Sequence, residues 1–166
     1  MLATPLQLAS ATGTLATRGI RYEPHLVAAV EDALTGQRTM TSPKRLADVT
    51  IKDPSHLDSV TNAMHGVMHG LQGTARAAAA GAEYEMAGKS GTAQVFSVSQ
   101  EEEYDEDEVE ERLRDHALFI AFAPFDNPRI AVAIVVENGS SGSRVAAPIA
   151  RAMMDEYLGY GANAPQ

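Results

Sequence analysis

The sequence predicts a mixed fold of the α/β class (α+β type), in which antiparallel sheet strands combine with N-terminal helices and a C-terminal helix packed on the sheet. Apolar residues recur at helical spacing in three separate segments of the chain. Two nearly all-apolar runs, 116–124 and 129–138, are separated by a Phe-Asp-Asn-Pro turn. A pair of such runs indicates an antiparallel hairpin.

Length and composition place the chain among globular single domains. Its 166 residues suffice for one hydrophobic core, and 45% hydrophobic with 21% charged residues argues against disorder. The sequence has no cysteine, which excludes a disulfide scaffold and a thiolate metal site. It shows no internal repeat, no signal peptide and no apolar run of the roughly 20 residues that a membrane span needs.

The charge is concentrated in one segment. The net charge of −9 argues against nucleic acid as a partner. Nine of the 22 acidic residues fall between 101 and 111, so 13 acidic residues remain against 13 basic ones elsewhere. We interpret residues 99–115 as an acidic insertion, a solvated surface loop or helix between two strands. It lacks the spaced Asp/Asn residues and central glycine of a calcium loop.

The first helix begins near Thr4. This residue suits the N-cap, Pro5 suits the first helical position, and Gln7 completes a capping box. Gly19 is a typical stop. The apolar face of this helix is predicted to consist of Leu8, Ala11 and Leu15.

The next segment, 24–33, reads as a strand that ends in a Thr35-Gly36 turn. Residues 36–54 carry few apolar side chains and two prolines, which indicates a loop. A second helix is predicted over 55–71. Its apolar positions are Leu57, Val60, Met64, Val67, Met68 and Leu71.

The two strands of the predicted hairpin are apolar at nearly every position, so we expect both faces of their sheet to be covered. A last helix over 146–158, with Pro148 in its first turn, is expected to cover one face. Its apolar stripe is predicted to be Ala150, Met153, Met154 and Tyr157. Residues 160–166 read as a frayed tail.

Polar chemistry is concentrated in the predicted strand 86–98, at Lys89-Ser90-Gly91-Thr92. A glycine inside a strand often marks the close approach of a ligand or another backbone, because no Cβ holds it off. A cation beside hydroxyl groups suits a carboxylate or phosphate, to which it offers charge-assisted hydrogen bonds. An ordinary polar patch on a strand would explain these four residues equally well if they stood alone.

Two histidines, His65 and His69, stand four residues apart on the second predicted helix, as zinc ligands often do. Position 66 is a glycine, and no third ligand is evident. These histidines are therefore interpreted as polar positions of an amphipathic helix rather than as a metal site. His116, which opens a strand close to the acidic run, is interpreted as the partner of a carboxylate.

A serine-type nucleophile is also missing. Neither Ser-x-x-Lys nor Ser-x-Asn occurs in the sequence. Thr41 and Lys44 have the spacing of a nucleophile and its base. Pro43 between them, inside a predicted loop, argues against a helical nucleophile turn.

Seven segments of the chain are similar, in the same order, to segments of one known family. They are 3–9, 21–27, 73–76, 87–95, 115–124, 130–139 and 147–150. Within 87–95, Lys89-Ser90-Gly91 is similar to the Lys-Thr-Gly signature of serine β-lactamases and penicillin-binding proteins, with serine at 90 keeping the hydroxyl. The chain thus resembles the transpeptidase region of class B penicillin-binding proteins, and in particular those that act in the elongation of rod-shaped Gram-negative bacteria.

The resemblance implies a partial β-lactamase/transpeptidase-like fold. Residues 1–159 would form the C-terminal portion of a D,D-transpeptidase domain, with three strands of a five-stranded antiparallel sheet. The parent enzyme would cross-link peptidoglycan stem peptides by serine acyl transfer and be acylated by β-lactams. Its nucleophile, Ser-x-Asn motif, pedestal domain and membrane anchor would lie upstream of Met1. We therefore expect this chain to be a soluble and catalytically inactive fragment. The parent protein is expected to lie at the periplasmic face of the bacterial inner membrane.

The resemblance also implies residue roles. Lys89 would be the catalytic lysine that hydrogen-bonds the serine of the missing Ser-x-Asn motif. Ser90 and Thr92 would bind the carboxylate of the D-Ala-D-Ala stem peptide or of a β-lactam. The backbone of Thr92 would form half the oxyanion hole, and the edge at Gly91 and Thr92 would pair with the peptide as an added strand.

The expected partners are the stem peptide and β-lactams, the N-terminal remainder of the domain, and membrane proteins of the elongation complex; no cofactor, metal or nucleic acid is expected. Two alternatives remain. One is a serine β-lactamase or β-lactam sensor, which shares the motif, although segments 3–5 and 137–139 resemble the transpeptidases more. The other is a non-catalytic α/β module that binds a protein through the acidic segment.

Overall fold

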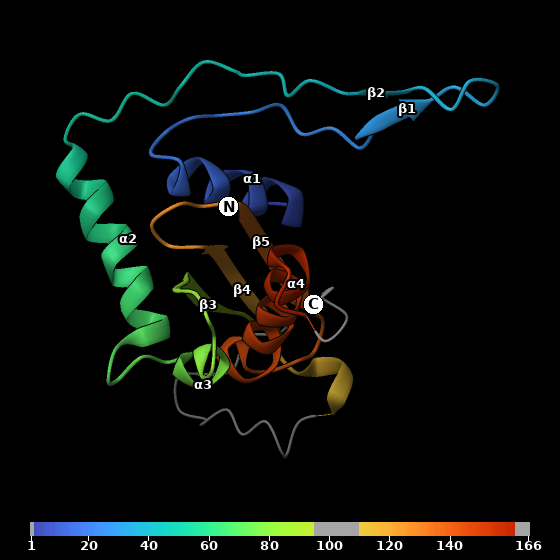
Figure 1. Cartoon of the computed structure of the whole chain (residues 1–166). Coiled ribbons are helices and arrows are strands. Elements are labelled where there is room, and N and C mark those ends of the chain that lie inside the picture. Colours follow the sequence, from blue (N-terminus) through green and yellow to red (C-terminus); the bar gives the residue numbers. More distant parts are fainter. Residues whose placement is uncertain (1, 95–109, 162–166) are drawn as a thin grey trace.

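The computed structural model describes residues 2–94 and 110–161. At its centre is an antiparallel sheet of three strands in the order β3-β4-β5, with helices on both faces (Figure 1). The strands are β3 (Ala87–Ala93), β4 (His116–Ala123) and β5 (Ile130–Val136). The predicted hairpin and the mixed fold class are therefore confirmed, while positions 95–98 of the predicted strand 86–98 lie outside the described residues.

Helix α1 (Pro5–Ala16) begins with the predicted capping box. The backbone N–H of Gln7 donates to Oγ1 of Thr4 over 3.2 Å, and the Gln7 side chain accepts from the N–H of Thr4 at 2.8 Å. The predicted apolar face is wrong at Ala11, which is exposed, whereas Thr12 is buried. Thr12 can be buried because its hydroxyl donates to the carbonyl oxygen of Leu8 at 2.7 Å.

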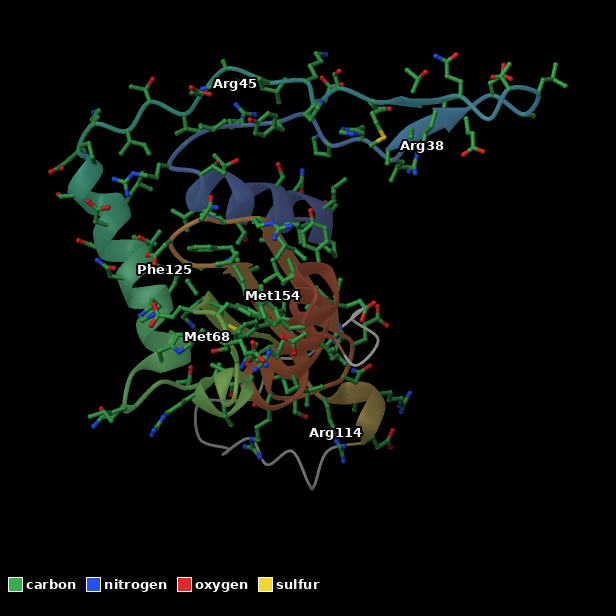
Figure 2. All side chains as sticks on the ribbon, in the orientation of Figure 1. Arg38, Arg45, Met68, Arg114, Phe125 and Met154 are labelled. Carbon is green, nitrogen blue, oxygen red and sulfur yellow. The ribbon has the colours of Figure 1, made fainter. Side chains whose placement is uncertain are left out.

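An extended ribbon follows α1 and projects beyond the body of the molecule, carrying Arg38 and Arg45 (Figures 1 and 2). It contains the strands β1 (Ala29–Glu31) and β2 (Arg38–Met40), which pair with each other. The predicted strand 24–33 is therefore too long, and the predicted loop 36–54 contains a strand. Both strands are largely exposed, so the pattern of hydrophobic residues carried little information about where they begin and end. The predicted turn at Thr35-Gly36 is present.

Helix α2 (Pro54–His69) starts at Asp53, whose carboxylate accepts from the backbone N–H of Ser55 at 2.9 Å. Met64 and Met68 are buried as predicted, but Val60 is half exposed. Leu71 lies beyond the end of the helix and is also exposed. A short helix, α3 (Arg76–Ala79), links α2 to the sheet, and the 3₁₀ turn η1 (Glu111–Leu113) precedes β4. No helix in the described part of the chain is long and apolar enough to cross a bilayer.

Helix α4 (Ala147–Leu158) follows a single π-helical turn, η2 (Gly142–Ala146), and has Pro148 in its first turn as predicted. Its buried stripe is Ala147, Ala150 and Met154. The predicted positions Met153 and Tyr157 are wrong, because both are about half exposed. Figure 2 places Met154 at the centre of the molecule, near Met68 of α2.

The core has two parts, one on each face of the sheet, so the expectation that both faces are covered is confirmed. The larger part joins the sheet to α4, to α3 and to the end of α2 at Met68, and the smaller part joins the sheet to α1 and to α2 at Met64. Members of the larger part include Met68, Met86, Phe119, Ala121, Val132, Ala150 and Met154. Members of the smaller part include Met64, Ala87 and Phe122.

A histidine pair joins the end of α2 to the start of β3. Nε2 of His69 accepts the backbone N–H of Met86 at 3.1 Å, which requires a neutral ring with its proton on Nδ1. Nε2 of His65 lies 3.2 Å from a carboxylate oxygen of Glu85, and the two imidazole rings stack 4.7 Å apart. Burial lowers the pKa of His69 from its usual value, and the neighbouring His65 adds to this effect.

Truncation of the two adjacent methionines of α4, one at a time, should show which of them contributes to the core. Met154 is fully buried and Met153 is 48% exposed. We expect Met154→Ala to lower the free energy of unfolding by about 2–5 kcal/mol, because it leaves a cavity. The matched control Met153→Ala should cost less than about 1 kcal/mol. Urea denaturation of the three proteins measures the difference, and equal losses would contradict the assigned stripe.

The His69 contact predicts a pH dependence of stability. A histidine whose folded-state pKa is lowered stabilises the fold above the unfolded-state value, and this contribution disappears as the pH falls through the folded-state value. Between about pH 7.5 and about pH 5, wild type should lose more stability than His69→Gln, whose amide oxygen can still accept the Met86 N–H. His25→Gln, at an exposed histidine, should behave like wild type. An identical slope in His69→Gln would refute the role of His69.

Candidate active-site strand

Strand β3 lies at the edge of the sheet, with β4 as its one partner among the described residues. Its seven residues pair in register with β4, from Ala87 opposite Phe122 to Ala93 opposite His116. In an antiparallel ladder, alternate residues direct their N–H and C=O groups toward the neighbouring strand and the others direct them outward. The outer edge of β3 can therefore accept an extended peptide as an added strand.

The predicted site residues occupy consecutive positions on β3 and divide between the two faces of the sheet. Ser90 and Thr92 share one face with their cross-strand partners, Phe119 and Ala117. Lys89, opposite Ile120, projects from the other face. The side chains of Ser90 and Thr92 are thus neighbours on one face of the sheet, and the side chain of Lys89 leaves the strand on the opposite face.

The Lys89 side chain is exposed, and its ammonium group donates to the carbonyl oxygen of Ser90 at 2.5 Å. The cation therefore lies close to the backbone of the strand. Thr92 is also exposed, whereas Ser90 and Gly91 are partly buried. A cation and two hydroxyl groups within four residues can supply several hydrogen bonds to one carboxylate.

The close approach of the β3 backbone to the ring of Phe119 depends on Gly88. A Cβ atom at this position would lie 2.7 Å from two ring carbons of Phe119, which is closer than non-bonded carbons approach. Phe119 is only 1% exposed and packs in the larger core, so its ring has little room to move. Gly88 therefore allows the strand that carries Lys89 to lie directly on the aromatic ring.

Sequence reasoning missed a second glycine that contacts this strand. Gly142, the first residue of η2, is buried against the backbone of Gly91 and Leu118. The available signal was its place in a Ser-Ser-Gly-Ser stretch between the last strand and the last helix. Such a stretch reads as an ordinary turn, so the sequence did not indicate the contact.

The other candidates from the sequence are used in structural contacts. His65 and His69 bond to Glu85 and to the backbone, and no group of three potential metal ligands occurs in the described residues. Lys44 pairs with Glu23 rather than with Thr41.

Nδ1 of His116 accepts the backbone N–H of Asn138 at 2.9 Å, so this ring nitrogen is engaged by a backbone group rather than by a carboxylate. Most of the acidic insertion, including seven of the nine carboxylates between 101 and 111, lies outside the described residues. At its end, Glu110 pairs with Arg112 at 2.7 Å.

Two apolar grooves, of about 390 and 490 Å³, run beside α1 at Leu6 and Tyr22, and neither is lined by residues of β3.

Comparison with known proteins matches the penicillin binding protein transpeptidase domain to residues 1–155. The peptidoglycan D,D-transpeptidase MrdA of Haemophilus influenzae is 42% identical over 156 residues, which are 94% of this chain and 24% of that protein. MrdA of Escherichia coli K12 is 36% identical over 157 residues, with coverage of 94% and 24%. The chain thus spans about a quarter of the length of these curated relatives.

Solved structures agree with the sequence comparison. Pseudomonas aeruginosa PBP2 in complex with WCK 5153 superposes with a TM-score of 0.72 at 42% identity, covering 98% of this chain and 32% of that one. PBP2 from Helicobacter pylori, solved in complex with MreC, gives a TM-score of 0.68 at 28% identity, with coverage of 95% and 25%. The three-stranded sheet with α4 on one face has the β-lactamase/transpeptidase fold, and the chain belongs to the penicillin-binding protein transpeptidase domain family.

Proposed function

We propose that this chain is the C-terminal portion, residues 1–159, of the transpeptidase domain of a peptidoglycan D,D-transpeptidase of the penicillin-binding protein 2 type. The enzyme cross-links stem peptides by serine acyl transfer and is acylated by β-lactams. One observation carries this proposal: Lys89, Ser90 and Thr92 lie together on the open edge strand of a transpeptidase fold. The 42% identity to a relative named peptidoglycan D,D-transpeptidase supports the choice of activity.

In this function, Ser90 and Thr92 bind the terminal carboxylate of the stem peptide or the carboxylate of a β-lactam. Their positions two residues apart on one face allow both hydroxyls to donate to the same group. Hydrogen bonds to an ionised acceptor are about twice as strong as those between neutral groups. The two side chains together therefore fix the end of the substrate.

Lys89 acts by its charge. Its ammonium group, now held at the carbonyl oxygen of Ser90, turns in the complete site to the serine hydroxyl of a Ser-x-Asn motif and supports proton transfer there. The backbone N–H of Thr92 contributes half of the oxyanion hole, where preorganised donors stabilise the developing negative charge. The outer edge at Gly91 and Thr92 pairs with the substrate backbone.

The nucleophile comes from outside these 166 residues, because the sequence contains no Ser-x-x-Lys. In the complete site, the serine oxygen attacks the carbonyl carbon of the penultimate D-Ala and forms an ester. The terminal D-Ala leaves with a proton on its amine. An amine of a second stem peptide then attacks the ester, forms the new amide and restores the serine hydroxyl.

The proposed location and partners follow from the same relatives. The parent protein is held at the periplasmic face of the bacterial inner membrane and works with membrane proteins of the elongation complex. The complex of Helicobacter pylori PBP2 with MreC supports a protein partner of this kind. The part of the domain that carries the nucleophile is a further partner of this chain.

The isolated chain should not react with penicillin. Removal of a nucleophile lowers the rate of serine acylation by several orders of magnitude, because no oxygen remains to form the ester. After incubation with a fluorescent penicillin and denaturation, we expect no covalent label on the 166-residue polypeptide. The longer gene product that contains the chain is the positive control. A label that survives denaturation on the isolated chain would refute the proposed origin of the nucleophile.

Substitutions on β3 should separate charge from shape in the longer gene product. Lys89→Ala should slow acylation by penicillin at least about a hundredfold, the scale of a single electrostatic catalytic group. Ser90→Ala should cost less, because Thr92 retains part of the carboxylate's hydrogen bonding. The matched control Ser90→Thr keeps the hydroxyl and should be nearly silent. Second-order acylation rates provide the measurement.

Near-normal acylation in Lys89→Ala would mean that the strand only shapes the cleft. A severe loss in Ser90→Thr would show that the added methyl group is not accommodated beside the partly buried position of Ser90.

A further inference from the structure

The loop between β5 and α4 touches the middle of the proposed substrate-binding strand through Gly142. A Cβ atom on Gly142 would lie 2.6 Å from the carbonyl oxygen of Gly91 and 3.1 Å from its amide nitrogen. It would also overlap the carbonyl oxygen of Leu118, the residue opposite Gly91 on β4. These are backbone atoms of a hydrogen-bonded ladder, which cannot rotate away as the end of a side chain can.

The contact lies on the face of the sheet from which the two hydroxyl-bearing side chains project. A Cβ atom on Gly139, in the same loop, would lie 3.1 Å from the Cβ of Ala117, which is the cross-strand partner of Thr92. Ser90 and Thr92 leave β3 on this face, on either side of Gly91. Gly142 therefore abuts the backbone between the two proposed carboxylate-binding residues.

The loop is fixed by contacts that do not involve β3. The side-chain amide of Asn138 donates to the carbonyl oxygens of Arg112 and Arg114 at 3.0 and 2.9 Å, and the backbone N–H of Ser140 donates to the carbonyl oxygen of Asp115 at 2.8 Å. Asn138 and Ser140 have φ values of +55° and +58°, a left-handed backbone conformation that is uncommon for non-glycine residues, although asparagine is enriched there.

We propose that Gly142 is a positioning residue for the carboxylate-binding strand. The loop is tied to the residues just before β4, and an added methyl group at 142 presses on Leu118 of the central strand and on Gly91 of the edge strand. Because the central strand is held on both sides, Gly91 is the group that moves. Displacement of Gly91 separates or tilts the hydroxyls of Ser90 and Thr92 and moves the backbone N–H of Thr92. This role rests on the proposed transpeptidase function and goes beyond it, because Gly142 touches the strand and not the substrate.

The test compares Gly142→Ala with a matched glycine variant, Gly73→Ala. A Cβ at Gly73 would meet the carbonyl oxygens of Val67 and Gly66 at 2.5 and 2.7 Å, in the connection between α2 and α3, so both variants add a methyl group against backbone. In the longer gene product, Gly142→Ala should slow acylation by a fluorescent penicillin about 10- to 100-fold, the scale of a small misplacement of reacting groups. Gly73→Ala should change the rate less than about threefold at the same temperature below unfolding.

A second measurement uses the 166-residue chain and needs no activity. In amide NMR spectra, Gly142→Ala should shift the resonances of Gly91 and Thr92, while Gly73→Ala should leave them in place. If wild-type gene product is not acylated, the proposed function fails, and unchanged Gly91 and Thr92 resonances in Gly142→Ala would separately overturn the positioning role. Shifted resonances with normal acylation would overturn its importance for the reaction.

If Gly142→Ala does not fold, Asn138→Gly provides the second variant. Glycine tolerates the positive φ at 138 and removes the amide that ties the loop to Arg112 and Arg114, with no atom added near β3. The freed loop should hold Gly91 less firmly, with acylation slowed at least about fivefold and broadened Gly91 and Thr92 resonances. Unchanged rates and resonances in this variant would overturn the proposal.

Discussion

The close packing of β3 against groups that tolerate no Cβ atom is the constraint on which the site depends. Gly88 allows the strand to pack on the ring of Phe119. The backbone of Gly91 packs against Gly142, which lies in the loop before α4. Phe119 belongs to the larger part of the core, which α4 covers, so the packing of α4 also affects the position of β3 relative to this ring. Under the proposed function, stability and substrate binding would therefore be coupled through the same atoms, because core packing is dense and transmits small displacements.

The strand is held at several points and left open at one edge. His69 accepts the backbone N–H of Met86 just before the strand begins, β4 pairs with its full length, and Gly142 abuts its middle. Among the described residues, the outer edge has no strand partner. An arrangement of this kind presents backbone donors and acceptors to a peptide in fixed positions, so less conformational entropy is lost when the peptide binds.

Local chemistry was predictable from the sequence, and long-range packing was not. The capping box at Thr4 and the hairpin of β4 and β5 depend on neighbouring residues, and both are present. The choice between Met153 and Met154 depends on how α4 is rotated on the sheet, which helical spacing alone does not fix. The contiguous residues from Lys89 to Thr92 stood out as a group, whereas Gly142 is about fifty positions away in sequence and has no side chain to reveal its contact.

Charge explains why such positioning matters. The chain has a net charge of −9, and even without the nine carboxylates between 101 and 111 its acidic and basic residues only balance, 13 against 13. The net charge of this chain therefore provides no long-range attraction for an anion, and at physiological salt such fields are screened over about 8 Å. In the proposed function, recognition of the substrate carboxylate therefore rests on short-range donors, the hydroxyls of Ser90 and Thr92. Hydrogen bonds weaken steeply with distance and angle, so under the proposed function the glycine contacts that hold the strand in place would also affect the strength of that recognition.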